Sequence, residues 1–268
     1  MRLLLNEVDP SIAPATEVEG ALLAALYAYP ERDAAAGQPA GRRWLRANMV
    51  STLDGAASGA DGRTGSINTE ADRQVFQLLR ALADVIVVGA GTARVEGYRA
   101  PQPPRDWLAT VREGRPAAPS LAVVTRTGNL PLQLTVPPED DAPDAGEVFL
   151  VTCGAADERA VEAAREVLGE QRVLVVGDDE VDLAAMVEAL GGRGLTRMLT
   201  EGGPTLLHDL AAAGLVDEIC LTVVPHLVGG HHPRILDGEG VDVPLMPRLL
   251  LESEGTLLGR WSTALPSY

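Results

Sequence analysis

The chain has 268 residues, of which 46% are apolar, and a formal net charge of −16, so it is long enough to bury a substantial core. The acidic excess opposes a nucleic-acid partner or an anionic membrane surface, because phosphate groups would be repelled. No apolar run is long enough to span a membrane and the N-terminus lacks a signal-peptide pattern, so we expect a cytoplasmic protein. All 22 basic residues are arginines, which excludes Schiff-base and Walker-type lysine chemistry.

Apolar runs alternate with helical patterns along the chain, which favours α/β layering. Strands are expected at 3–5, 44–50, 85–88, 121–125, 148–152, 173–176, 198–200 and 218–224. Helical spacing indicates helices at about 17–28, 68–80, 156–168, 181–190 and 204–213. The β-branched run 85–88 is typical of a central strand buried on both faces. The last part, 247–265, is expected to form two strands joined at Gly259.

Three segments between these elements are expected to be irregular. Residues 30–41 form a loose connection, and residues 55–65 are rich in Gly, Ala and Ser, which is typical of a mobile flap. Residues 99–119 are rich in proline and are interpreted as a surface excursion. This last segment is not a convincing domain linker, and residues 1–268 are expected to form a single domain.

A glycine turn follows the expected strand at 198–200. Gly202 and Gly203 would let the backbone approach a bound group closely, and Pro204 suits the first turn of a helix because its missing N–H is not needed there. The free N–H groups and positive dipole end of that helix favour phosphate. Glu201 would repel a phosphate, so we expect it to contact a second, polar ligand.

A second glycine turn, Gly89-Ala90-Gly91-Thr92-Ala93-Arg94, follows the strand at 85–88. It almost matches the dinucleotide fingerprint, but Arg94 stands where a small residue is needed and the turn does not open an N-terminal βαβ unit. Two glycines and Thr92 still make a cradle for phosphate or ribose. Two such turns in one sheet predict a dinucleotide with its diphosphate between them.

A third strand end carries Thr125 and Arg126. A guanidinium there would hold the 2′-phosphate that distinguishes NADPH from NADH; the alternative is an ordinary surface arginine. No metal site is expected, because His226, His231 and His232 lie in a Gly/Pro-rich loop without a carboxylate at ligand spacing.

Several motifs occur in a familiar order: Ser-Thr-Leu-Asp-Gly at 51–55, Gln-Leu-Leu-Arg at 77–80, Val-Gly-Ala-Gly-Thr at 88–92, and Glu-Gly-Gly-Pro-Thr-Leu at 201–206, with 215–218 leading into 224–230. Together they resemble the C-terminal reductase domain of the bifunctional riboflavin-biosynthesis deaminase-reductases (RibD type), whose fold is similar to dihydrofolate reductase. The resemblance covers roughly 43–265, with 1–42 as an N-terminal extension packed on the domain. The deaminase signature, HxE followed by PCxxC, does not occur.

The resemblance implies an α/β fold with a mainly parallel central sheet flanked by helices and with C-terminal antiparallel strands. It also implies that NADPH gives a hydride to the ribose C1′ of an aminopyrimidine ribosylamine phosphate, as in a 5-amino-6-(5-phosphoribosylamino)uracil reductase of riboflavin biosynthesis. Two alternatives remain open: dihydrofolate reductase-like activity on a pteridine, and a non-catalytic NADPH-binding sensor. A homodimer supported by the turn at 225–230 and the closing strands is implied as well.

By position, the resemblance and the glycine turns together assign the cofactor to Ser51, Gly91, Thr92, Glu96, Thr125, Arg126, Gly202, Gly203, Pro204, Thr205, Leu206 and Leu207. On the substrate side, Arg80 would face the phosphate, and Glu201 would contact the pyrimidine or ribityl part.

Glu201 is also the candidate catalytic residue, because a carboxylate favours the positive charge that develops near C1′. Asn48 stands where many bacterial members have Lys, and Glu96 stands where the bacterial members often have Asp. Asn at the first of these positions also resembles the archaeal and fungal reductases. Asp54 is expected at the substrate, with the alternative that it serves the backbone of its own turn.

Overall fold

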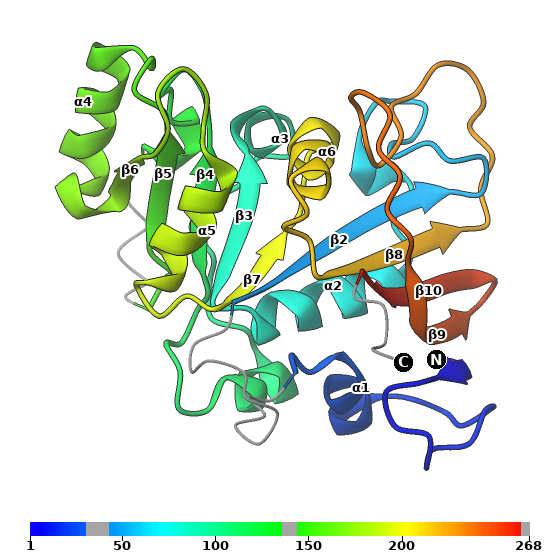
Figure 1. The fold of residues 1–268 in the computed structure, drawn as a ribbon. Helices are drawn as coiled ribbons and strands as arrows, with labels where there is room; N and C mark the ends of the chain where they lie inside the picture. The colour runs from blue at the N-terminus through cyan, green and yellow to red at the C-terminus, as the bar shows by residue number, and fades with distance from the viewer. Residues whose placement is uncertain (31–42, 136–143, 264–268) are drawn as a thin grey trace.

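The computed structural model describes residues 1–30, 43–135 and 144–263, which form a ten-stranded sheet with helices on both faces (Figure 1). The strand order is β1-β9-β10-β8-β2-β7-β3-β4-β5-β6. The neighbours from β8 to β6 are all parallel, and β10, β9 and β1 continue the sheet antiparallel. The predicted fold class, a mainly parallel α/β sheet with C-terminal antiparallel strands, is therefore confirmed.

The strands follow the apolar runs closely. They are β1 (Arg2–Asn6), β2 (Trp44–Thr52), β3 (Val85–Gly89), β4 (Ser120–Val124), β5 (Val148–Thr152), β6 (Val173–Val175), β7 (Arg197–Thr200), β8 (Glu218–Val224), β9 (Met246–Ser253) and β10 (Thr256–Ser262). The α-helices are α1 (Gly20–Tyr27), α2 (Glu70–Leu82), α3 (Ala90–Val95), α4 (Glu158–Leu168), α5 (Leu183–Gly191) and α6 (Pro204–Ala212). Short 3₁₀ turns lie between them, including η3 (Asp106–Arg112).

Two apolar layers lie on opposite faces of the sheet, as the alternation of side chains along each strand requires. In β3, Ile86 and Val88 face the layer that holds α1, α2 and α4. Val85 and Val87 face the opposite layer, which holds α5 and α6. The central strand is thus buried on both faces, as the run of β-branched residues predicts.

Local signals explain where α2 begins and ends. The side chain of Thr69 accepts a hydrogen bond from the backbone N–H of Asp72 at 3.3 Å, which caps the first turn. Acidic residues in the first turn and Arg80 in the last turn complement the helix dipole. This start places Arg80 near the carboxyl end of the parallel strands, where a ligand site is expected.

The predicted end of the sheet is wrong in one respect. The last two strands are joined at Glu254 and Gly255, which have φ values of 49° and 80°, and Gly259 lies inside β10. A Cβ on Gly259 would overlap the ring of Trp261, so this glycine makes room for an aromatic side chain and not for a turn. The expected connection at 31–41 and the final positions 264–265 lie outside the described residues.

The N-terminal residues are joined to the sheet by an edge strand and by a buried charge cluster. β1 pairs with β9, and the C-terminal carbonyl groups of α1 accept hydrogen bonds from Arg46 and Arg260. Both guanidinium groups also contact Glu218, at 2.6 Å and 2.8 Å. This cluster of Arg46, Glu218 and Arg260 connects β2, β8 and β10 to α1 in the interior.

Candidate functional site

The two glycine turns meet at the carboxyl ends of β3 and β7. The N–H of Gly89 donates to the carbonyl of Gly202 at 2.8 Å, and the N–H of Glu201 donates to the carbonyl of Val87 at 3.0 Å. A Cβ on Gly203 would collide with the hydroxyl of Thr92. The expected adjacency of the turns is therefore present, but the close approach at Gly203 is made by Thr92 and not by an open ligand surface.

A cavity of about 600 Å³, here called the α2 cavity, opens beside this junction. Its walls come from β2, the flap, α2 and the segment after α3. Five residues assigned from the sequence line it: Asn48, Arg80, Thr92, Glu96 and Glu201. Glu96 also accepts a hydrogen bond from the N–H of Thr64 at 3.2 Å, so it connects the end of α3 to the flap. Residues assigned from separate motifs thus share the lining of one cavity.

Glu201 does not stand alone in the α2 cavity. Its two carboxylate oxygens accept hydrogen bonds from Nε and Nη2 of Arg80, both at 2.7 Å, and Oε2 also accepts from the hydroxyl of Tyr98 at 2.5 Å. The guanidinium lies over the ring of Phe76 at 4.2 Å. Arg80 and Glu201 thus form a forked ion pair that the sequence did not predict, while their assigned contacts with the substrate stay predictions.

The environment keeps both groups that donate to Glu201, the Arg80 guanidinium and the Tyr98 hydroxyl, protonated. Burial alone would lower the pKa of Arg80, but the carboxylate of Glu201 outweighs it and raises the pKa above its ordinary value. Burial and the same carboxylate raise the pKa of Tyr98. At neutral pH, Glu201 therefore accepts from a cation and from a neutral phenol.

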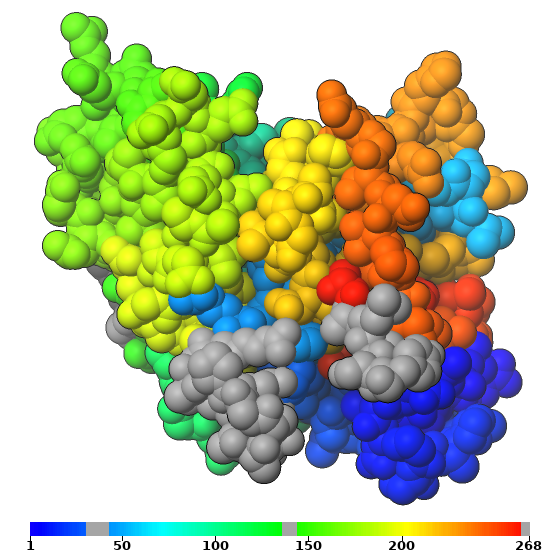
Figure 2. Space-filling view, viewed as in Figure 1, coloured from blue at the N-terminus to red at the C-terminus, as the bar shows by residue number. Residues whose placement is uncertain are grey.

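A second cavity of about 560 Å³, here called the α6 cavity, lies on the other side of the glycine junction. Residues assigned to the cofactor that line it are Gly91, Thr125, Arg126, Thr205 and Leu206. The start of α6 opens onto it, and α6 itself packs between α5 and the orange segment that follows β8 (Figure 2). The side chain of Arg126 is 75% exposed and lies 3.7 Å from Glu180, an interaction that solvent weakens.

Six of the assigned residues line neither cavity. Three of them, Gly202, Gly203 and Pro204, lie at the second glycine turn and the start of α6. Ser51 and Leu207 are buried in the protein interior. The carboxylate of Asp54 accepts hydrogen bonds from the N–H groups of Val228 and Gly229, at 3.2 Å and 2.7 Å. A hydrogen bond from the Thr52 hydroxyl is the main cause that lowers the pKa of Asp54. Asp54 thus holds the turn at 225–230, a contact that neither assignment predicted, and its place at the substrate stays a prediction.

Three functional candidates in the α2 cavity were missed by sequence reasoning: Asp72, Tyr98 and Arg99. Tyr98 follows the end of α3, where no periodic pattern singles it out. Asp72 lies in the first turn of a helix, where an acidic residue is expected for the helix dipole alone.

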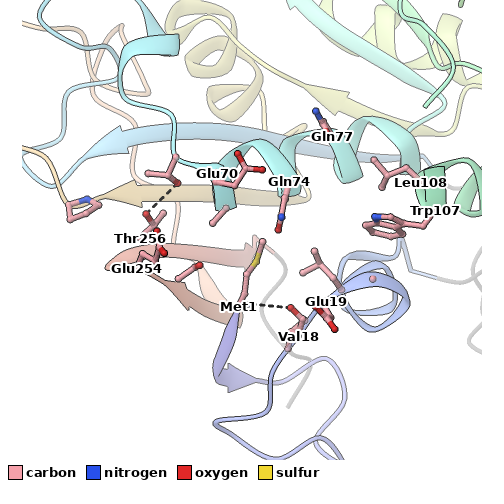
Figure 3. A pocket seen from close by; sticks show the side chains of 16 residues that line it. Met1, Val18, Glu19, Glu70, Gln74, Gln77, Trp107, Leu108, Glu254 and Thr256 are labelled. Atoms are coloured by element: carbon pink, nitrogen blue, oxygen red, sulfur yellow. Dashed lines mark hydrogen bonds between the residues drawn. The ribbon is translucent and has the colours of Figure 1, made fainter. Parts of the chain in front are cut away.

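A further cavity of about 670 Å³ lies between α1, α2 and the β9–β10 turn (Figure 3). Met1, Glu70, Trp107 and Glu254 are among its walls, and none of the assigned residues lines it. Within residues 1–30, 43–135 and 144–263, no group of three or more His, Cys, Asp or Glu side chains is arranged to hold a metal ion. In the same ranges, no helix has the length and apolar character needed to cross a bilayer.

Comparison with known proteins defines the class of this α/β protein, which has the α2 cavity and the α6 cavity on either side of its glycine turns. The model of the RibD C-terminal domain matches residues 43–257. The 2,5-diamino-6-ribosylamino-4(3H)-pyrimidinone 5′-phosphate reductase of Methanothermobacter thermautotrophicus is 32% identical over 75% of this chain and 87% of that protein. The corresponding reductase of Archaeoglobus fulgidus is 30% identical over 74% and 88%. The chain belongs to the RibD C-terminal domain family and is homologous to pyrimidine reductases.

A solved structure agrees at the level of the fold. A pyrimidine reductase-like protein from Corynebacterium diphtheriae superposes with a TM-score of 0.71 at 23% identity, over 82% of this chain and 91% of that one. The bifunctional RibD protein of Mycobacterium tuberculosis is 28% identical, and the match covers 79% of this chain but only 50% of that protein. The family that the sequence motifs indicated is therefore confirmed, while the role of each residue stays a prediction.

Proposed function

We propose that this chain uses NADPH to reduce an aminopyrimidine ribosylamine phosphate, the type of substrate named for its archaeal relatives. The observation that carries the proposal is the junction of the two cavities. The α2 cavity holds the polar side chains, the α6 cavity holds the glycines and hydroxyls, and the turns at 89–92 and 201–205 separate them. A dinucleotide crossing this junction would present its reactive ring to a substrate in the α2 cavity.

The α6 cavity has the chemistry that a dinucleotide requires. Gly91 has no heavy atom within 4 Å of where a Cβ would stand, so a phosphate can approach its backbone. The first N–H groups of α6 and the hydroxyls of Thr125 and Thr205 are donors for phosphate and ribose. When bound there, NADPH supplies the hydride.

The α2 cavity would hold the substrate. Hydride addition at C1′ is accompanied by cleavage of the C1′–O4′ bond, and O4′ takes up a proton. Positive charge develops near C1′ before the hydride arrives, and the carboxylate of Glu201 favours that charge. Its pairing with Arg80 weakens this field in the free protein. A substrate phosphate would compete for Arg80 and so release part of the negative charge of Glu201 when the substrate is in place.

Arg99 is a second candidate for the phosphate. Its side chain is exposed on the wall of the α2 cavity and makes no hydrogen bond or ion pair with any described residue. Arg80 and Arg99 would then share the phosphate from two sides, as charge-assisted bonds from guanidinium groups allow.

The test is NADPH consumption by the purified protein with three substrates offered separately: the diaminopyrimidinone ribosylamine phosphate, the aminouracil ribosylamine phosphate and dihydrofolate. We expect turnover with at least one ribosylamine phosphate and formation of the ribitylamino product, identified by mass spectrometry. Turnover of dihydrofolate alone would favour the pteridine alternative. Tight NADPH binding without turnover of any of the three would favour the sensor.

A further inference from the structure

Asp72 is a carboxylic acid inside the α2 cavity that has no role in the scheme above. It is 5% exposed and lies in the first turn of α2, two helical turns before Arg80 and on the same cavity wall. Asn48 of β2 lines the same cavity. The carboxyl group of Asp72 is thus in the same compartment as the polar groups proposed to hold the substrate.

The surroundings of Asp72 satisfy only part of its hydrogen-bonding capacity. With its amide oriented to suit both neighbours, Asn68 donates to Oδ2 of Asp72 at 3.3 Å and to the carbonyl of Thr64 at 3.1 Å. No ion pair joins Asp72 to an arginine among the described residues. Burial raises the pKa of Asp72, and the hydroxyl of Thr222 on β8 and the charge of Arg73 offset this only in part.

A buried carboxylate without an ion-pair partner is destabilising, because no cation within the protein offsets the desolvation of its charge. A ligand with two parallel N–H groups would offset that desolvation, since a carboxylate accepts two hydrogen bonds side by side. Such a pair occurs on a 2-amino-4-oxopyrimidine ring, at the exocyclic amino group and the adjacent ring N–H. A 2,4-dioxopyrimidine ring offers one N–H next to a carbonyl oxygen at the same edge.

We propose that Asp72 binds the amino-bearing edge of the pyrimidine and selects the 2-amino-4-oxo ring over the 2,4-dioxo ring. This inference rests on the proposed function, because it assigns the ring specificity of that same cavity. The dioxo ring would place its carbonyl oxygen against an acceptor, which leaves two buried lone pairs facing each other without a proton. The protein would therefore act on the ring before its amino group is removed, so any hydrolytic deamination of that ring must follow this reduction.

The test compares kcat/KM for the diaminopyrimidinone and aminouracil ribosylamine phosphates in the wild type and in Asp72→Asn. We expect the wild type to favour the amino ring by on the order of 10- to 100-fold, the effect of one charged hydrogen bond. The amide of the variant is able to donate to a carbonyl oxygen, so the ratio should fall to near one or invert. The KM for NADPH should stay unchanged.

Glu70→Gln is the matched control, because Glu70 lies on the same helix with its carboxylate 71% exposed and outside the α2 cavity. It should keep the wild-type ratio. If Asp72→Asn fails to fold by circular dichroism, Asp72→Ser removes the same charge with less bulk. An unchanged ratio in the folded variant, or a wild type that prefers the dioxo ring, overturns the inference while the proposed function stands. A wild type that reduces neither ring overturns both.

Discussion

Glu201 and Arg80 show how far residue-level prediction reaches. Each was placed at a ligand site from its own motif, Glu201 before a glycine turn and Arg80 at a helix end. Their ion pair was not predicted, because the two residues are 121 positions apart and periodicity specifies a face but not which side chains meet across it. Tyr98 was missed for the same reason, since its position is set by tertiary contacts alone.

Replacing Glu201 with Gln should lower turnover by one or more powers of ten, at about 1.4 kcal/mol for each. The amide keeps the shape but removes the charge that we propose to face C1′, and it leaves Arg80 without its counter-ion. NADPH affinity should change little, because Glu201 lines the α2 cavity only. Steady-state kinetics and a cofactor titration measure the two effects separately.

Tyr98→Phe provides the comparison for Glu201→Gln. It removes a single hydrogen bond to the same carboxylate and keeps the ion pair with Arg80, so its effect on turnover should be smaller. Wild-type turnover in Glu201→Gln would show that the carboxylate only positions Arg80.

Replacing Arg126 with Ala should weaken NADPH binding by roughly 1.5 to 3 kcal/mol, the range for a hydrogen bond to a charged group, and leave NADH binding nearly constant. The side chain is too exposed to stabilise the fold appreciably. Isothermal titration with both cofactors checks this.

The neighbouring Glu180 supplies a control for Arg126. Glu180→Gln removes a carboxylate 3.7 Å from the guanidinium, so NADPH should bind slightly more tightly. Equal losses of NADPH and NADH affinity in Arg126→Ala would rule out the 2′-phosphate assignment.

At the scale of elements, the sequence predicted every strand of the parallel part, because apolar runs occur where both faces of a sheet are covered. The hairpin between β9 and β10 was misplaced because its turn is a two-residue connection of Glu254 and Gly255 with positive φ at both positions. Glu-Gly is a weak turn signal beside a second glycine four residues later. Gly259 has a packing role that only the contact with Trp261 reveals.

The contact between the two glycine turns predicts the outcome of Gly203→Val. The added side chain would push Thr92 from its place at the start of α3, while the strands beneath remain paired. NADPH affinity should therefore fall strongly while the circular dichroism spectrum stays that of the wild type. Gly91→Ala is a suitable control, because its Cβ would meet no heavy atom within 4 Å in the protein, so any loss of affinity there reports on the ligand itself. A variant of Gly203 that unfolds, or that binds NADPH normally, would contradict this expectation.

At the scale of the whole molecule, the cluster of Arg46, Glu218 and Arg260 makes the free energy of unfolding depend on pH in the acid range. Burial alone would raise the pKa of Glu218, but the two arginines outweigh it and lower the pKa below its ordinary value. A lowered folded-state pKa means that this stabilisation is present above the unfolded value of about 4.5 and is lost as the pH falls further.

Glu218→Gln should lower the free energy of unfolding by about 3 to 5 kcal/mol at pH 7, because it leaves two buried arginines without a counter-charge. Urea denaturation at pH 7 and at pH 4 should show a smaller pH dependence for the variant than for the wild type. Arg2 and Glu252 form an exposed pair at the sheet edge, and Glu252→Gln serves as the control with a small effect. The predicted homodimer is independent of this experiment and stays a prediction.

The pairing of β1 with β9 also affects the tendency of separate molecules to aggregate. β1 is a short outermost strand whose register shifts between Leu3 and Leu5, a poor template for a foreign strand. Without it, the edge of the sheet would be β9, eight residues long with three consecutive leucines at its centre. Its unpaired N–H and C=O groups would invite strands from other chains, as in fibril growth. By covering the edge of β9, β1 thus opposes aggregation. The mutual repulsion of molecules with a charge of −16 opposes it as well.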